Sequence, residues 1–155
     1  MAAIKIRMFL RARPDRSSGT AAIEFGLAIP FFLILLMGVV EVGFAMYQAM
    51  QVYNSVEAGM LYASKNGFDA AGITAAVTNA TGTTGITATP APTQFCGCPV
   101  AGGISAINCN STCANGTPVE QYIQINATLP HQTILPYPGL PLPTNLTAKS
   151  IVRLK

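Results

Sequence analysis

The stretch that decides the fold is Phe25–Val40, FGLAIPFFLILLMGVV, sixteen consecutive residues without a charge. After Glu41 the apolar character resumes with VGFAMY, so the segment Phe25–Tyr47 spans 23 residues. At a rise of about 1.5 Å per residue, a helix of this length measures roughly 34 Å. Because the hydrocarbon core of a bilayer is about 30 Å thick, we expect a membrane-spanning helix here.

Two other structures are compatible with such a run. One is the buried core helix of a soluble protein, but a chain of 155 residues with 14 Gly and 11 Pro is too short to wrap a shell around it. The other is a cleaved secretory signal peptide, whose apolar region has about 7–15 residues and ends at small residues such as those of Ala45–Ala49. The run is longer and helix-like sequence follows it, so a retained anchor is favoured.

Composition and charge agree with an anchor. Only 10% of the residues are charged, against roughly 25% in soluble domains, and the mean hydropathy is +0.42. These values argue against a cytosolic enzyme and against a nucleic-acid partner. Residues 1–16 carry five basic side chains and one acidic, a net +4, whereas the other 139 residues sum to −1. The positive-inside rule therefore predicts a cytoplasmic amino terminus and an extracytoplasmic carboxyl part, with lipid as a partner.

The residues before the run form a second pattern, from Arg16 through Gly19, Thr20 and Glu24 to Phe25. Counted from Thr20, the glutamate stands at the fifth position and an aromatic residue follows it. This pattern resembles the processing site of type IV prepilins of the Flp/Tad branch, in which cleavage follows a glycine.

The wider stretch 19–64 is similar to the TadE-like family of pseudopilins, minor components of the Tad/Flp type IVc pilus system. The matching features are the small residues before Glu24, then Pro30, the Leu/Ile block and the Glu41-x-Gly43 pair. The resemblance implies a single-pass protein of the bacterial inner membrane or pilus, cut after Gly19 by a prepilin peptidase. It implies as partners the Flp major pilin, other minor pseudopilins and the inner-membrane platform, and a role in pilus assembly, surface adherence or secretion.

Glu24 has a physical reason to take part in assembly. An ionisable side chain at the edge of a membrane span is costly and normally has a partner. If the chain is cut after Gly19, the new α-amine of Thr20 lies one helical turn before Glu24 on the same face, on its own chain or on a neighbour. The resemblance implies the neighbour, which Glu24 would draw into register. The alternative is a snorkelling carboxylate at the headgroup level.

Two further residues of the run need an explanation. Pro30 lacks a backbone donor and should kink or loosen the helix, although prolines are also tolerated in membrane helices. Glu41 follows Glu24 by about 25 Å of helix and should approach the outer interface. There it is either solvated or involved in subunit pairing.

Beyond the membrane, the pattern predicts that the helix continues to Lys65 and stops at Asn66-Gly67. A short second helix is expected over 69–80, with Asp69 as its cap.

The rest of the chain favours strands and loops. Residues 81–118 are rich in Thr, Gly, Ala and Pro and indicate loop with short strands. Alternating apolar residues predict strands over 119–129 and 145–154, joined by the proline-rich connection 130–143. Such strands would form a small antiparallel sheet laid against the helix.

Four cysteines occur as Cys96-x-Cys98 and Cys109-x3-Cys113, all in the predicted extracytoplasmic loop 95–114. An even count outside the cytoplasm indicates disulfides, and three pairings are open. A bridge within the first pair would be strained, so one cysteine of each pair should join the other. A zinc site is the alternative, but the spacing lacks the usual pair of CxxC knuckles.

These observations predict an α+β, membrane-anchored fold with a long amino-terminal transmembrane and amphipathic helix and a small, disulfide-stapled, antiparallel β-rich domain. We expect three segments: a basic cytoplasmic leader at 1–19, the helix at 20–65 and an extracytoplasmic domain at 66–155.

Catalytic patterns are missing from the sequence. The single histidine, His131, stands in the proline-rich connection, where a surface position is expected. We find no Ser-His-Asp set, nucleotide-binding glycine loop or metal-spaced carboxylates. We therefore expect no enzyme, no catalytic residue, no cofactor and no metal. The alternative to a pilus component is a single-span periplasmic anchor or binding module.

Overall fold

The structure is a computed structural model that describes residues 17–134 and 142–154. The basic residues of the predicted leader and most of the proline-rich connection lie outside this part. The chain divides into two compact units, Met1–Val39 and Val40–Lys155. Each unit is described by itself below.

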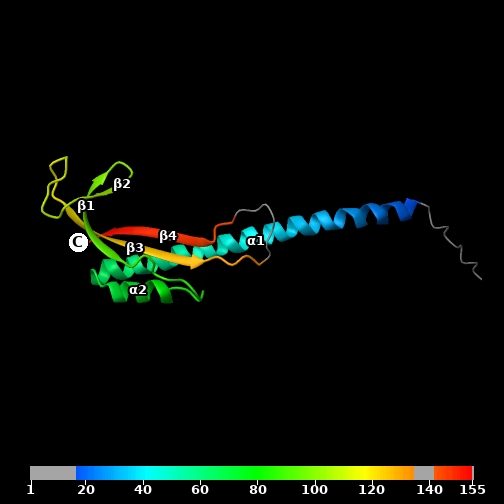
Figure 1. Ribbon diagram of the computed structural model, residues 1–155, viewed down its shortest axis with the longest axis horizontal. Coiled ribbons are helices and arrows are strands. Elements are labelled where there is room, and N and C mark those ends of the chain that lie inside the picture. Colours follow the sequence, from blue (N-terminus) through cyan, green and yellow to red (C-terminus); the bar gives the residue numbers. More distant parts are fainter. Residues whose placement is uncertain (1–16, 135–141, 155) are drawn as a thin grey trace, which may run out of the picture. The chain divides into compact units, whose positions relative to one another are not determined.

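The described part of the first unit is a continuous helix. It is the start of α1, which runs from Ser17 to Asn66 and contains Pro30 (Figure 1). From Gly19 to Val40 no residue is buried, and the most apolar 18-residue window, with a mean hydropathy of 2.4, has none of its residues buried. The described residues therefore contain one helix that is long and apolar enough to cross a membrane. Its exposure disfavours a soluble core helix.

The second unit begins with the remainder of α1 and a second helix. At the end of α1 the Gly67 N–H donates to the Ala63 carbonyl at 2.9 Å, and Gly67 has a φ of +79°. A glycine in the left-handed region is the usual helix stop, so the predicted end is confirmed. Helix α2 spans Ala70–Asn79, and the Asp69 side chain accepts the Ala71 N–H at 3.1 Å. The predicted helix and its cap are thus confirmed.

The remaining elements form one antiparallel sheet. Its strands are β1 (Thr93–Val100), β2 (Gly103–Ala106), β3 (Glu120–Pro130) and β4 (Asn145–Arg153), in the order β2-β1-β3-β4. The two strands expected from alternation are β3 and β4, and their register runs from Tyr122↔Arg153 to Pro130↔Asn145. The fold is therefore α+β, as the sequence predicts.

Both helices cover one face of this sheet (Figure 1). That face carries the alternate residues Ile123, Ile125 and Ala127 of β3, which are fully buried. Gly59 of α1 is packed tightly against α2 and β3, because a Cβ atom there would lie 2.6 Å from a Val77 methyl in α2 and 3.2 Å from an Ile125 methyl in β3. The remaining members of the core cluster are Val52, Val56, Ala63, Ile73, Ile86, Leu129 and Ala148.

Two disulfides tie the loop after β2 to β1. Cys96 pairs with Cys109 and Cys98 with Cys113, with Cα–Cα distances of 5.1 and 5.7 Å. Side chains two positions apart on a strand lie on the same face, so the Cys-x-Cys spacing presents both sulfurs to one crossing loop. The predicted pairing between the two cysteine pairs is confirmed, and with all four sulfurs oxidised no thiolate remains for zinc.

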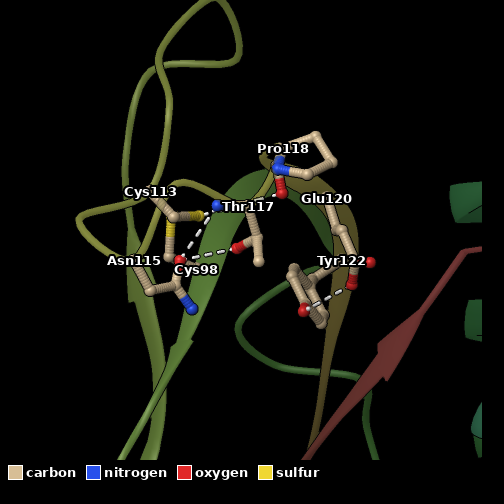
Figure 2. The surroundings of a disulfide bond; sticks show 7 residues. All are labelled: Cys98, Cys113, Asn115, Thr117, Pro118, Glu120 and Tyr122. Atoms are coloured by element: carbon tan, nitrogen blue, oxygen red, sulfur yellow. Dashed lines mark hydrogen bonds between the residues drawn. A yellow bond between two sulfur atoms is a disulfide. The ribbon is translucent and has the colours of Figure 1, made fainter.

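A tight turn holds the second disulfide in place (Figure 2). The side-chain oxygen Oδ1 of Asn115 accepts the Thr117 N–H at 3.2 Å and the Thr117 hydroxyl at 2.7 Å. The Cys113 N–H donates to the Thr117 carbonyl at 3.0 Å, which closes the turn. The loop therefore has its own hydrogen bonds in addition to the covalent links.

The close packing of Gly59 against α2 and β3 can be tested. We predict that Gly59→Ala destabilises the fold by about 1–3 kcal/mol, because the added methyl must displace the stiff side chain of Val77. Thermal unfolding in detergent, followed by the near-ultraviolet circular dichroism of tyrosine, measures the change.

Gly43→Ala is the matched control, since a Cβ there meets nothing within 4 Å. This change should leave the fold unharmed or stabilise α1 by up to about 1 kcal/mol. Equal melting temperatures for the two variants would contradict the packing described.

Candidate functional site

The residues of the predicted processing site occupy the first turns of α1. Gly19, Thr20, Glu24 and Phe25 are all exposed, and Phe25 keeps 68% of its surface accessible. The helix places Thr20 and Glu24 one turn apart on one face. A Cβ at Gly19 would meet nothing within 4 Å. The described residues therefore leave the surroundings of the Gly19–Thr20 peptide bond open.

The other sequence-predicted residues lie elsewhere. Pro30 stands in the same helix, but the predicted kink stays a prediction. The four cysteines belong to the second unit and are all used in its disulfides. The candidate residues thus form separate groups.

Glu41 is buried, and this corrects the expectation that it is solvated or pairs with another subunit. Only 3% of its surface is accessible. Its two carboxylate oxygens accept the backbone N–H of Ile134 at 3.0 and 3.2 Å. The carboxylate therefore receives a charge-assisted hydrogen bond from a residue 93 positions later in the chain.

His131 is also buried, with 8% of its surface accessible, so the expectation of a surface histidine is wrong. Its Nδ1 lies 2.6 Å from Oε1 of Gln48, within hydrogen-bonding distance. Its Nε2 lies 3.9 Å from Oε1 of Glu41 and makes no hydrogen bond with the described residues. We call Glu41, Gln48, His131 and Ile134 the Glu41 cluster.

The Glu41 cluster fastens the chain after β3 to α1. Residues 131–134 leave the end of β3, and each of the two polar contacts joins this segment to a side chain of the helix. Glu41 and Gln48 are seven residues apart and therefore share one helix face. The seven-residue spacing of Glu41 and Gln48 is visible in the sequence. No feature of the neighbouring sequence predicts that residues 131–134 contact them.

Because of the Glu41 cluster, the part of α1 that the chain leaves uncovered differs from the span expected from the sequence. The sequence suggested a span of Phe25–Tyr47, but Glu41 and Ala45 are buried by the chain's own residues. The stretch that no described residue covers is Gly19–Val40, 22 residues and roughly 33 Å long. Glu24 therefore stands near the start of this stretch, inside it rather than before it.

Potential metal ligands do not cluster in the part of the chain that the structure describes. Among residues 17–134 and 142–154, no group of three or more His, Cys, Asp or Glu side chains could hold a metal ion. A hollow of about 500 Å³ opens beside the Glu41 cluster, between Phe44, Gln48, Leu129 and Ile134.

One comparison with known proteins bears on the uncovered helix. The model of a family described as TadE-like protein matches residues 19–61. This stretch is TadE-like. The match confirms the resemblance inferred from the sequence and indicates a component associated with the Tad pilus. No curated protein and no solved structure matches the chain.

The TadE-like stretch covers 43 of the 155 residues and lies entirely within α1. It contains the predicted processing residues from Gly19 onward and the helical half of the Glu41 cluster. His131 and Ile134 lie beyond it, so the family gives no information on the segment that buries Glu41. The TadE-like family is a structural family without enzymatic activity.

Removal of the Glu41 carboxylate tests the cluster. We predict that Glu41→Ala loosens residues 131–134 and destabilises the second unit by about 1.5–3 kcal/mol, because the Ile134 amide loses a charged acceptor. Hydrogen exchange of the peptide containing Ile134 should accelerate correspondingly.

Glu57→Ala is the matched control, since Glu57 lies on the same helix with an exposed side chain. This substitution should leave both the exchange rate and the stability within about 0.5 kcal/mol of the unsubstituted chain. Unchanged protection at Ile134 in Glu41→Ala would refute the contact.

Proposed function

We propose that the chain is a minor pilin-like subunit, a pseudopilin, of a Tad/Flp pilus. In this proposal a prepilin peptidase cuts after Gly19, and the subunit contributes to pilus assembly, surface adherence or secretion without acting as an enzyme. The observation that carries the proposal is the TadE-like match, which begins at Gly19 and covers the exposed apolar helix.

The location of the helix ends supports membrane residence before assembly. After a cut, the uncovered stretch would be Thr20–Val40, 21 residues and roughly 31 Å, which matches a hydrocarbon core of about 30 Å. With the basic residues of the leader on the cytoplasmic side, the second unit would lie in the periplasm or outside the cell. Its two disulfides suit an oxidising compartment.

The charge at Glu24 supplies the assembly step. At about six ångströms from the new terminus, measured along the helix, its carboxylate would stand within the edge of the hydrocarbon. An uncompensated charge there is costly, so it would seek the Thr20 α-amine of its own chain or of an adjoining subunit. Pairing with an adjoining subunit would set the axial register of the two helices.

The exposed apolar side chains supply the attraction between subunits. Leaving lipid for a filament requires that other helices cover the stretch Thr20–Val40 on every side. The proposed partners are accordingly the Flp major pilin and other minor pseudopilins, with the inner-membrane platform and the prepilin peptidase acting earlier. A loosened turn at Pro30 would help the helix to bend during this transfer.

Processing after Gly19 has a direct readout. In cells with an active prepilin peptidase, mass spectrometry of the membrane-extracted protein should find Thr20 as the amino terminus and a chain of 136 residues (155 minus 19). Gly19→Val should block the cut because a branched side chain replaces the residue before the bond.

Gly38→Val serves as the control, because Gly38 lies in the same helix with open space around it. It should be cut as usual. An intact Met1 terminus in the unsubstituted protein would overturn the processing step and favour a plain single-span anchor.

Replacement of Glu24 tests the assembly role. We predict that Glu24→Ala inserts into the membrane normally but lowers piliation at least tenfold, since a loss of about 1.4 kcal/mol per contact changes an association constant tenfold. Counts of surface pili by electron microscopy and membrane fractionation measure the two properties. Glu57→Ala should leave both unchanged, and normal piliation with Glu24→Ala would rule out this role.

A further inference from the structure

The chain after β3 follows α1 back to the level of Val40 (Figure 1). His131, directly after the strand, has its Nδ1 2.6 Å from Oε1 of Gln48. Three residues later the Ile134 N–H donates to a carboxylate oxygen of Glu41 at 3.0 Å. Glu41 immediately follows Val40, the last residue of the uncovered stretch. The backbone at Ile134 is therefore fixed at the height where that stretch ends.

The length of a membrane span puts the hydrocarbon boundary at the same height. About 20 residues of helix cover about 30 Å, the thickness of the hydrocarbon core. Counted from Thr20, such a span ends at Val39, and counted from Phe25, where the uncharged run begins, it ends at Phe44. Glu41 lies between these two limits, and so does the N–H that it accepts.

Apolar and aromatic side chains near this height are exposed. Ile134 keeps 56% of its surface accessible, and Tyr47, about 10 Å beyond Val40 along the helix, keeps 55%. Tyrosine is one of the residues that concentrate where hydrocarbon meets water. Phe44 and Thr84 line the hollow beside Ile134. We call Phe44, Tyr47, Thr84 and Ile134 the proximal end of the second unit.

The charges of the second unit lie away from the proximal end. The nearest on α1, Glu57, follows the buried Glu41 by 16 residues, or about 24 Å. The nearest on the sheet, Lys149, is paired with Asn126, eight residues before Ile134. The other Asp, Glu, Lys and Arg residues among the described part of this unit are Lys65, Asp69, Glu120 and Arg153. The proximal end can therefore leave water without desolvating a charge.

We propose that the proximal end rests in the lipid leaflet at which the uncovered stretch ends, with Ile134 at the hydrocarbon boundary and Tyr47 in the headgroup layer. The partner is a lipid surface, contacted through apolar and uncharged polar groups and therefore without a need for anionic headgroups. The hydrogen bond between Glu41 and Ile134 holds this second contact at a fixed depth. The inference requires that α1 spans a membrane and is independent of the pilus role.

Tryptophan fluorescence tests the depth of the proximal end, because the chain contains no tryptophan of its own. Full-length Ile134→Trp is reconstituted into phosphatidylcholine vesicles with or without brominated acyl chains, which quench an indole at close range. We expect bromines near the carbonyl groups to remove roughly half of its emission, since the indole would lie at the interface. Thr84→Trp, a reporter on a different loop, should also lose emission.

Two further variants calibrate this measurement. Val100→Trp is the matched control, because Val100 is 52% exposed but lies beyond the other end of β3, where Gly97 pairs with Glu120. The 11 residues of β3 extend over about 36 Å, so Val100→Trp should keep its emission. Phe32→Trp, within the uncovered stretch, should be quenched most by bromines near the ends of the acyl chains. Circular dichroism checks that each variant retains the fold.

The proposal fails if neither Ile134→Trp nor Thr84→Trp is quenched more than Val100→Trp. Emission from these two variants that is shifted to shorter wavelength but not quenched would assign the proximal end to a protein partner and would also overturn it. Unquenched emission from Phe32→Trp would overturn it together with the membrane anchor.

Discussion

The rest of the structure depends on one constraint, namely that the helix between Gly19 and Val40 cannot remain in water. Thirteen large apolar side chains in this stretch are exposed by 39–72%. Covering them is worth on the order of 15 kcal/mol, which equals or exceeds the net stability of a typical domain. A helix is the element that can carry such residues, because it satisfies its own backbone hydrogen bonds without water. Lipid or other helices must supply the cover.

The second unit has only a small hydrophobic core and needs other sources of stability. Eleven residues form its buried cluster, and α1 contributes only three of them from one face. Domains of this size bury a limited area on folding, so covalent links matter. Each disulfide closes a loop of about 14–16 residues and adds about 3 kcal/mol by restricting the unfolded chain. The Thr-, Gly- and Pro-rich composition is therefore compatible with a stable unit.

Elements with a strong local signal were predictable from the sequence. The apolar run, the Asn66-Gly67 stop, the Asp69 cap and the alternation of β3 each act within a few residues. That each cysteine of the first pair joins one of the second followed from the strain of a bridge within Cys96-x-Cys98, whereas the choice between the two remaining pairings stayed open. The burial of Glu41 and His131 was not predictable, because it depends on contacts between residues that are 83 and 93 positions apart. The position of β1 and β2 was also open, since the glycine, proline and alanine residues common in 81–118 have weak strand preference.

The two glutamates of the TadE-like stretch illustrate how context decides the role of the same side chain. Glu41 is buried by its own chain, and the backbone N–H of Ile134 donates to its carboxylate. Its charge is therefore stabilised within one molecule. Glu24 is exposed in an apolar stretch, and the described residues within one helical turn of it carry no positive charge. A carboxylate at such a place gains most from a cation that arrives with another helix. The first glutamate therefore fixes where the folded unit begins, whereas the second has a role only under the proposed function, in which processing and assembly would supply its contact.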